Sequence, residues 1–92
     1  MGLRVYTGGT FDLLHAGHIN FLKRCAELGS VTVSLNEDEF IEKYKGKRPI
    51  MSYREREAVL LGCRWVDRVV PNVGGADSRI SIDLCNPDLI VI

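Results

Sequence analysis

One ten-residue run, GTFDLLHAGH at residues 9–18, constrains the fold of this chain more than any other segment. Residues 3–7 before it alternate as in a β-strand, with Leu3 and Val5 on one face. After it, over residues 16–28, apolar side chains recur at three- and four-residue steps, as in an amphipathic helix. The run is therefore a tight connection between a strand and the start of a helix.

This connection carries many hydrogen-bond donors. Gly8 and Gly9 have no Cβ, so a ligand can approach the backbone closely there. The first N–H groups of the helix have no partner within it, and they form the positive end of its dipole. His15 and His18 lie at this helix start and can add side-chain donors, which suits the phosphates of a nucleotide. The carboxylate of Asp12 cannot bind phosphate directly, and we expect it to orient a neighbour or to approach a metal.

The rest of the chain continues to alternate between strand and helix patterns. The expected segments are a strand at residues 30–36, a polar, basic loop at 42–50, a helix from the capping residue Ser52 towards Cys63, a strand at 67–70, a loop at 72–77, a helix at 78–84 and a buried strand at 89–92. This alternation predicts an α/β fold with a parallel sheet and right-handed crossovers. Ligands of such sheets bind beyond the carboxyl ends of the strands, where the histidine connection and the loop after Asn36 both lie.

Composition is typical of a globular domain. The 92 residues make one domain at most, with 46% hydrophobic and 26% charged residues. A formal net charge of zero argues against a general binder of nucleic acid or of anionic membranes. Because no apolar stretch reaches transmembrane length and no signal-peptide pattern opens the chain, we expect cytoplasmic residence.

The three cysteines, Cys25, Cys63 and Cys85, lack metal-ligand spacing. We therefore expect their side chains to be buried as small hydrophobic groups.

The run at residues 9–18 resembles the signature of the HxGH nucleotidylyltransferases, and more narrowly that of the cytidylyltransferase family, closest to the glycerol-3-phosphate cytidylyltransferases. Further segments match that family in order: NEDEF at 36–40, KGK at 45–47, SYRER at 52–56 and RWVDRVVP at 64–71. The resemblance covers nearly the whole chain. It implies that residues 1–92 form a single cytidylyltransferase-like domain with a Rossmann-like parallel sheet and flanking helices.

The resemblance also implies a reaction, nucleotidyl transfer. A phosphate oxygen of an acceptor attacks the α-phosphorus of a nucleoside triphosphate, and pyrophosphate leaves. Because a phosphate monoester dianion is already a competent nucleophile, the protein needs to supply only alignment and charge neutralisation. Mg²⁺ is expected to travel with the triphosphate, since it prefers phosphate oxygens and retained waters to an all-protein cage. No metal site on the protein is expected.

The resemblance assigns roles to individual residues. The expected catalytic residues are His15, His18, Lys45 and Lys47, the expected nucleotide contacts are Gly9, Thr10, Phe11, His15, His18 and Arg56, and the expected contacts on the substrate side are Asp12 and Asp38. Spacing does not choose between the two lysines. Arg56 could clamp a phosphate bidentately or form an ion pair, and Arg54 is its rival. Trp65 is expected to pack or to contact a second subunit, so the resemblance allows a homodimer.

The C-terminus departs from the family pattern. The family continues beyond the strand at residues 89–92 into two further nucleotide-binding segments, which this sequence lacks. We therefore expect a partial chain that binds triphosphate weakly and turns over poorly by itself. CTP and a small phosphorylated polyol or alcohol, with glycerol 3-phosphate as first choice, are the expected substrates. The alternatives are adenylyl transfer from ATP and a nucleotide-binding module without turnover, because the base-reading segments are the missing ones.

Overall fold

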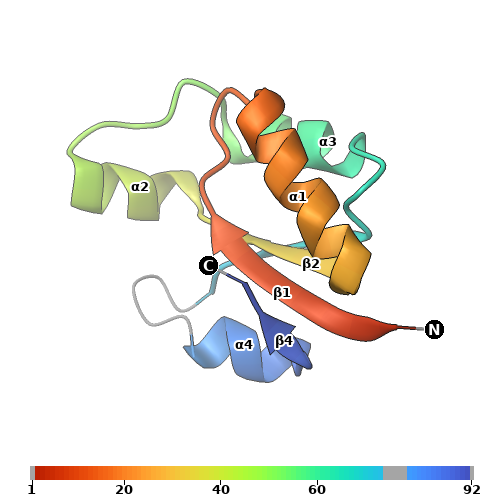
Figure 1. Cartoon of the computed structure of the whole chain (residues 1–92). Helices are drawn as coiled ribbons and strands as arrows, with labels where there is room; N and C mark the ends of the chain where they lie inside the picture. Colours follow the sequence, from red (N-terminus) through yellow and green to blue (C-terminus); the bar gives the residue numbers. More distant parts are fainter. Residues whose placement is uncertain (1, 74–78, 92) are drawn as a thin grey trace.

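The computed structural model describes residues 2–73 and 79–91 and shows an α/β fold (Figure 1). Its elements, in chain order, are β1 (Leu3–Gly9), α1 (Ala16–Leu28), β2 (Gly29–Leu35), α2 (Asp38–Lys45), α3 (Tyr53–Leu61), β3 (Arg68–Pro71), α4 (Arg79–Cys85) and β4 (Leu89–Ile90). The four strands form one parallel sheet in the order β3-β2-β1-β4. The predicted parallel sheet with flanking helices is thereby confirmed.

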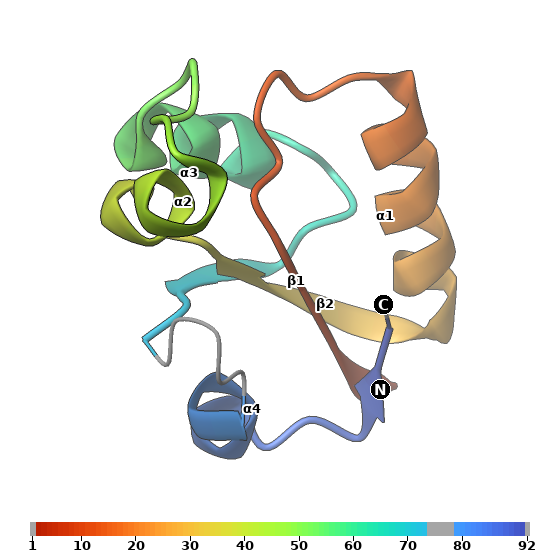
Figure 2. The same ribbon diagram turned by 90° about the vertical axis from the view of Figure 1, so that its left-hand side faces the viewer.

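The helices divide between the two faces of the sheet. β2 lies beside β1, and β3 lies beside β2 on the side away from β1. The chain then crosses back over the sheet, and β4 pairs with the other edge of β1. Crossovers between parallel strands are right-handed, so a reversal of direction moves the connecting helix to the opposite face. Accordingly α1 and α3 cover one face and α4 lies on the other (Figure 2).

The main core lies between the sheet and helices α1 and α3. Successive side chains of a strand point to opposite faces, so every second strand residue reaches this core. The fully buried apolar members are Val5, Leu22, Cys25, Val31, Val33, Leu35 and Leu60. Each aliphatic side chain buried in this way stabilises the fold by about 1.5–3 kcal/mol.

Cys25 and Cys63 are buried as expected, whereas Cys85 is half-buried. Burial also raises the pKa of the Cys25 thiol, which keeps the thiol protonated and unreactive.

The segment after β2 differs from the expectation. The polar, basic loop predicted over residues 42–50 is in its first part the end of α2, which Gly46 terminates in the left-handed conformation at φ 80°. Acidic side chains in the first turn and Lys43 and Lys45 in the last turn complement the helix dipole. Only Ile41 of this helix is buried. Phe40, Ile41 and Tyr44 recur at helical steps in this segment, but the charged residues among them led to its second half being read as a loop.

The last strand also differs from the expectation. β4 pairs with β1 and lies at the edge of the described sheet rather than at its centre. Leu89 is partly covered, but half of the Ile90 side chain is exposed, so the strand is not buried on both faces. The other element boundaries agree with the predicted ones to within two residues. Most of the loop expected at 72–77 falls outside the described residues.

Candidate active site

The start of α1 is held by its two histidines. His15 is the N-cap residue, and its Nδ1 accepts a hydrogen bond from the backbone N–H of Gly17 at 3.0 Å. The backbone N–H of His15 donates in turn to Nδ1 of His18 at 3.2 Å. This is the reciprocal pattern of a capping box, with histidines in the places that serine or threonine and glutamate usually occupy. The fold of this turn therefore depends on the same two side chains that the sequence assigns to catalysis.

The capping box also determines which ring nitrogen carries the proton. A nitrogen that accepts a hydrogen bond cannot hold a hydrogen, so a neutral imidazole bonded through Nδ1 carries its hydrogen on Nε2. Both His15 and His18 are in this state. Their ring centroids lie 4.1 Å apart, and neither Nε2 has a partner among the described residues. The site thus presents two adjacent N–H donors at the positive end of a helix, an arrangement suited to a phosphate.

His18 is tuned towards its neutral form. Burial lowers the pKa of His18 below its ordinary value of 6.5, because it disfavours the charged imidazolium, and the neighbouring His15 lowers the pKa further. A proton added to Nδ1 would also abolish the hydrogen bond from the backbone N–H of His15. The neutral Nε2–H tautomer is therefore the form present in the folded protein near neutral pH.

This pKa shift predicts a loss of stability in mild acid. Because the folded pKa of His18 is depressed, its contribution to stability is complete above pH 6.5 and is lost as the pH falls through the lower folded value. A urea titration repeated between about pH 8 and about pH 5 should show the midpoint falling over this window. In His18→Asn, whose side chain can cap but cannot titrate, the fall should be smaller. An equal fall in both proteins would contradict the prediction.

The connection before α1 has an unusual backbone. Phe11 and Leu13 both adopt positive φ, at 50° and 52°, a conformation that costs non-glycine residues about 1–3 kcal/mol each. A Cβ on Gly9 would lie 2.9 Å from the Phe11 ring, so any larger residue at this position would displace the ring. The ring of Phe11 also lies 5.4 Å from that of His18. Phe11 therefore packs between the end of β1 and the capping box.

Asp12 helps to hold this strained turn in place. Its carboxylate accepts hydrogen bonds from the backbone N–H groups of Ile50 at 2.7 Å and Met51 at 2.9 Å. Although burial acts to raise the pKa of Asp12, hydrogen bonds from Met51 and Ile50 and the charge of Arg56 hold it below its ordinary value of 3.8. Asp12 was expected to orient a neighbour or to contact the substrate. The structure shows it orienting the loop before α3.

Arg56 lies in the interior rather than at the surface of the site. Its side chain is fully buried, and its guanidinium donates to the carbonyl of Met51 at 3.0 Å, the carbonyl of Thr10 at 2.9 Å and the carboxylate of Asp38 at 2.7 Å. Two roles were open to Arg56, a phosphate clamp or an ion pair. In this structure Arg56 forms the ion pair. Asp38, expected on the substrate side, is engaged by Arg56 and by the backbone N–H of Tyr53. In this structure both side chains hydrogen-bond to other parts of the chain, and together they connect the segment after β1, the start of α2 and the start of α3.

The two candidate lysines lie at the end of α2 and just beyond it, and α2 and α1 lie on opposite sides of β1 (Figure 2). Lys45 ends α2, with its ammonium 5.7 Å from the Tyr44 ring centroid, and Lys47 follows one residue after Gly46. Within the described ranges 2–73 and 79–91 neither lysine forms an ion pair. The neighbouring Arg48 does form ion pairs, with Glu42 at 3.3 Å and with Asp38 at 3.9 Å. Lys45 and Lys47 are thus exposed cations.

Sequence reasoning placed the loop after Asn36 at this edge of the sheet, but it gave no role to Asn36 and did not single out Asn72. The amide of Asn36 donates to Oγ1 of Thr10 at 3.2 Å, and the amide of Asn72 donates to Oδ1 of Asn36 at 2.9 Å. Each asparagine directly follows a strand, β2 for Asn36 and β3 for Asn72. Polar residues that follow neighbouring parallel strands meet at one edge. The same positional signal would have added Asn72 to Asn36 and to Thr10, which follows β1.

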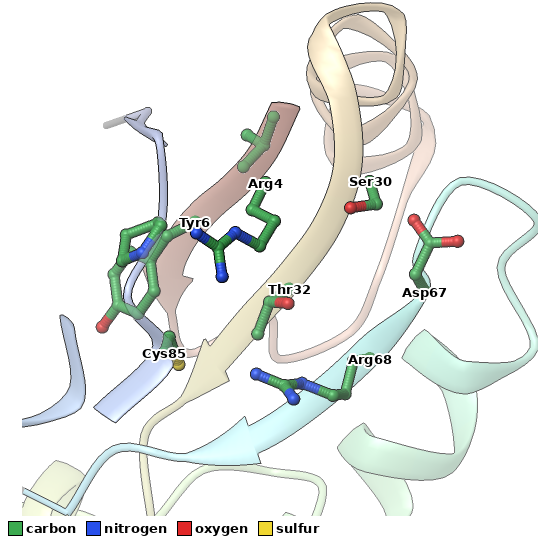
Figure 3. A pocket seen from close by; sticks show the side chains of 9 residues that line it. Arg4, Tyr6, Ser30, Thr32, Asp67, Arg68 and Cys85 are labelled. Atoms are coloured by element: carbon green, nitrogen blue, oxygen red, sulfur yellow. The ribbon is translucent and has the colours of Figure 1, made fainter. Parts of the chain in front are cut away.

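A separate hollow lies on the face of the sheet that α4 partly covers (Figure 3). It has a volume of about 320 Å³ and is lined by residues of β1, β2 and β3, among them Arg4, Thr32 and Arg68. Arg4 is already bonded to the carboxylate of Asp88, just before β4. Asp67 accepts a hydrogen bond from the backbone N–H at residue 31, also within the chain. This hollow is therefore distinct from the histidine turn and is bordered by groups that hold the strands together.

The fold and this turn together define a class of protein, an α/β domain in which a helix start with two free N–H donors lies at the carboxyl edge of a parallel sheet. Comparison with known families specifies it further. A family model described as cytidylyltransferase-like matches residues 6–92, and the chain belongs to this family. No helix in the described part of the chain is long and apolar enough to cross a membrane.

Individual relatives carry several different names. An FAD synthase of Thermococcus sibiricus is 44% identical over 91 residues, which cover 98% of this chain and 62% of that protein. A glycerol-3-phosphate cytidylyltransferase of Staphylococcus aureus is 38% identical over 90 residues, covering 97% and 67%. The crystal structure of a lipopolysaccharide core biosynthesis protein from Thermoplasma volcanium superposes with a TM-score of 0.86 at 33% identity, covering 98% and 73%. The chain thus spans about three fifths of the length of the FAD synthases that it matches.

Proposed function

We propose that this chain is the nucleotide-binding part of a nucleotidyltransferase that moves a nucleotidyl group from a nucleoside triphosphate to a phosphorylated acceptor. The observation that supports this most directly is the histidine capping box, which leaves the Nε2–H groups of His15 and His18 free at the start of α1. Membership of the cytidylyltransferase-like family agrees with this reaction.

In the proposed reaction the protein acts by positioning and charge stabilisation. An oxygen of the acceptor phosphate bonds to the α-phosphorus, the bond from that phosphorus to the bridging oxygen breaks, and pyrophosphate leaves. Negative charge grows on the bridging and equatorial oxygens, where His15, His18 and the dipole of α1 can stabilise it. Lys45 or Lys47 adds a cation from the opposite side. The triphosphate enters as its Mg²⁺ complex, so part of its charge is already neutralised on arrival.

Two nucleotides are candidates for this site. CTP is the first choice, with a small phosphorylated polyol or alcohol such as glycerol 3-phosphate, and the similarity to cytidylyltransferases supports it. ATP is the second, and it is favoured by the 44% identity to a protein named FAD synthase. No described residue reads a base. The choice of base therefore depends on an experiment rather than on the histidine turn.

A screen of pyrophosphate release tests the assignment. The protein as it is encoded is given each of the four triphosphates with Mg²⁺, against glycerol 3-phosphate, ethanolamine phosphate and flavin mononucleotide. We expect release with CTP and glycerol 3-phosphate. Release with ATP and none with CTP would replace cytidylyl by adenylyl transfer, and triphosphate binding without release under any pairing would leave a nucleotide-binding module.

A further inference from the structure

We propose that a directional chain of side-chain hydrogen bonds turns the hydroxyl proton of Thr10 towards the bound triphosphate, with Asn36 as the positioning residue. The inference rests on the proposed function, because it concerns how the same site binds its anion. It adds a role for polar side chains that lie behind the site and touch no ligand themselves.

The chain runs along the carboxyl edge of the sheet from α4 to the end of β1. The backbone N–H of Val73 donates to Oγ of Ser81 at 3.1 Å, and the Ser81 hydroxyl donates to Oδ1 of Asn72 at 2.9 Å. The amide nitrogen of Asn72 donates to Oδ1 of Asn36 at 2.9 Å, and that of Asn36 donates to Oγ1 of Thr10 at 3.2 Å. In the three bonds from Ser81 to Thr10, each donor lies nearer to α4 and each acceptor nearer to the histidine turn.

The members of this chain are well fixed. Only 2% of Ser81 is exposed. The backbone N–H of Asn36 donates to the carbonyl of Gly9, and that of Asn72 donates to the carbonyl of Leu35, both at 3.0 Å. These backbone bonds continue the strand pairing, so the two amides are anchored in line with the strand ends. α4 lies on one face of the sheet (Figure 2). This series of side-chain hydrogen bonds therefore connects α4 to the site at the edge of the sheet.

The direction of the chain decides what Thr10 offers to a ligand. A side-chain amide accepts hydrogen bonds through its oxygen and donates them through its nitrogen. When the oxygen of Asn36 accepts from Asn72, its nitrogen is therefore turned towards Thr10 as a donor. Oγ1 of Thr10 receives a hydrogen bond from Asn36, and the hydroxyl hydrogen has no acceptor among residues 2–73 and 79–91. A phosphate oxygen only accepts hydrogen bonds, so it needs this hydrogen. If the hydrogen bond ran the other way, the Thr10 hydroxyl would donate its hydrogen to Asn36. Only a lone pair of Oγ1 would then be directed at the phosphate.

A double-mutant cycle between Thr10 and Asn36 tests this inference. Thr10→Val removes the hydroxyl at nearly constant shape. Asn36→Asp places a carboxylate beside Thr10, and because a carboxylate only accepts hydrogen bonds, the hydroxyl must turn inward to donate to it. The dissociation constant of the Mg²⁺ complex of CTP, and of ATP in a parallel series, is measured by calorimetry on the wild type, both single variants and the double variant.

We expect Thr10→Val alone to weaken binding roughly tenfold, as for the loss of one hydrogen bond to a charged group. Asn36→Asp should weaken binding roughly tenfold more in the wild type than in the Thr10→Val background. The added negative charge acts in both backgrounds, so it cancels in this comparison. Thr10→Ser keeps a hydroxyl, and in that background Asn36→Asp should cause the same extra loss as in the wild type.

Two results would overturn the inference while leaving the proposed function intact. One is a Thr10→Val variant that binds triphosphate as the wild type does, which would show that Thr10 donates no bond to the ligand. The other is an equal loss from Asn36→Asp in both backgrounds, which would show that Asn36 does not control the Thr10 hydroxyl. If the wild type binds neither triphosphate, the proposed function fails first and the inference with it. Thermal unfolding of each variant shows that the comparison is made on folded protein.

Discussion

Replacement of His18 by asparagine should lower kcat by roughly 10²–10³-fold and leave the protein folded, the loss expected for one donor to transition-state charge. Asparagine carries its Oδ1 where histidine carries Nδ1, so it can still accept the hydrogen bond from the backbone N–H of His15. It has no donor at the position of Nε2. The variant therefore separates the capping function of this side chain from its proposed catalytic function. The measurement is pyrophosphate release at saturating substrates.

His18→Ala is the matched comparison. It removes the donor and the cap together, so kcat should fall as far as in His18→Asn, while stability falls by about a further 1 kcal/mol, as is usual for the loss of a cap. His15→Asn should behave like His18→Asn, because asparagine is among the preferred N-cap residues. Near-wild-type turnover in His18→Asn would remove this histidine from the mechanism.

Replacement of Arg56 by methionine should destabilise the protein by about 3–5 kcal/mol, the usual consequence of removing one partner of a buried ion pair. The substitution keeps much of the side-chain volume. It leaves the carboxylate of Asp38 without its 2.7 Å partner and the carbonyl groups of Thr10 and Met51 without donors. The midpoint of urea unfolding measures the effect, and a protein of this size can lose most of its stability in this way.

Arg54→Met on the same helix is the control. Arg54 is exposed, so its replacement should change the stability by no more than about 0.5 kcal/mol. Adding Asp38→Asn to Arg56→Met should recover part of the loss, because it removes the charge that loses its 2.7 Å partner and keeps only the distant Arg48. Equal midpoints for Arg54→Met and Arg56→Met would contradict the structural role of Arg56. They would return Arg56 to the list of candidate phosphate ligands.

The part of the site that local sequence could predict is the histidine connection. The strand before Gly9, the helix from Ala16 and the position of both histidines at the helix start all follow from periodicity, glycine and the chemistry of helix ends. Each of these signals involves residues fewer than about five positions apart. The sequence did not reveal that the histidines cap one another, because a capping box is usually recognised by serine or threonine with glutamate.

The roles of the charged residues required the folded chain. Arg56 and Asp12 each have chemistry that fits a phosphate or substrate contact, and nothing within their own segments excludes it. Arg56 bonds to the carbonyl of Thr10, 46 residues away, and Asp12 bonds to the backbone at residues 50 and 51. A buried charge must be paired, but its partner is set by which loops meet, and spacing along the chain does not specify that.

The sequence by itself therefore determined the class of fold, the position of the turn and the two histidines at the helix start, since these depend on local backbone preferences and on an apolar pattern that repeats over short distances. Only the tertiary structure decided which polar groups remain free at this edge of the sheet and which hydrogen-bond to other parts of the chain. It brings Thr10, Asn36 and Asn72 to one edge of the sheet and buries Arg56 behind them. The physical reason is that a parallel sheet aligns the ends of strands that lie far apart in the chain.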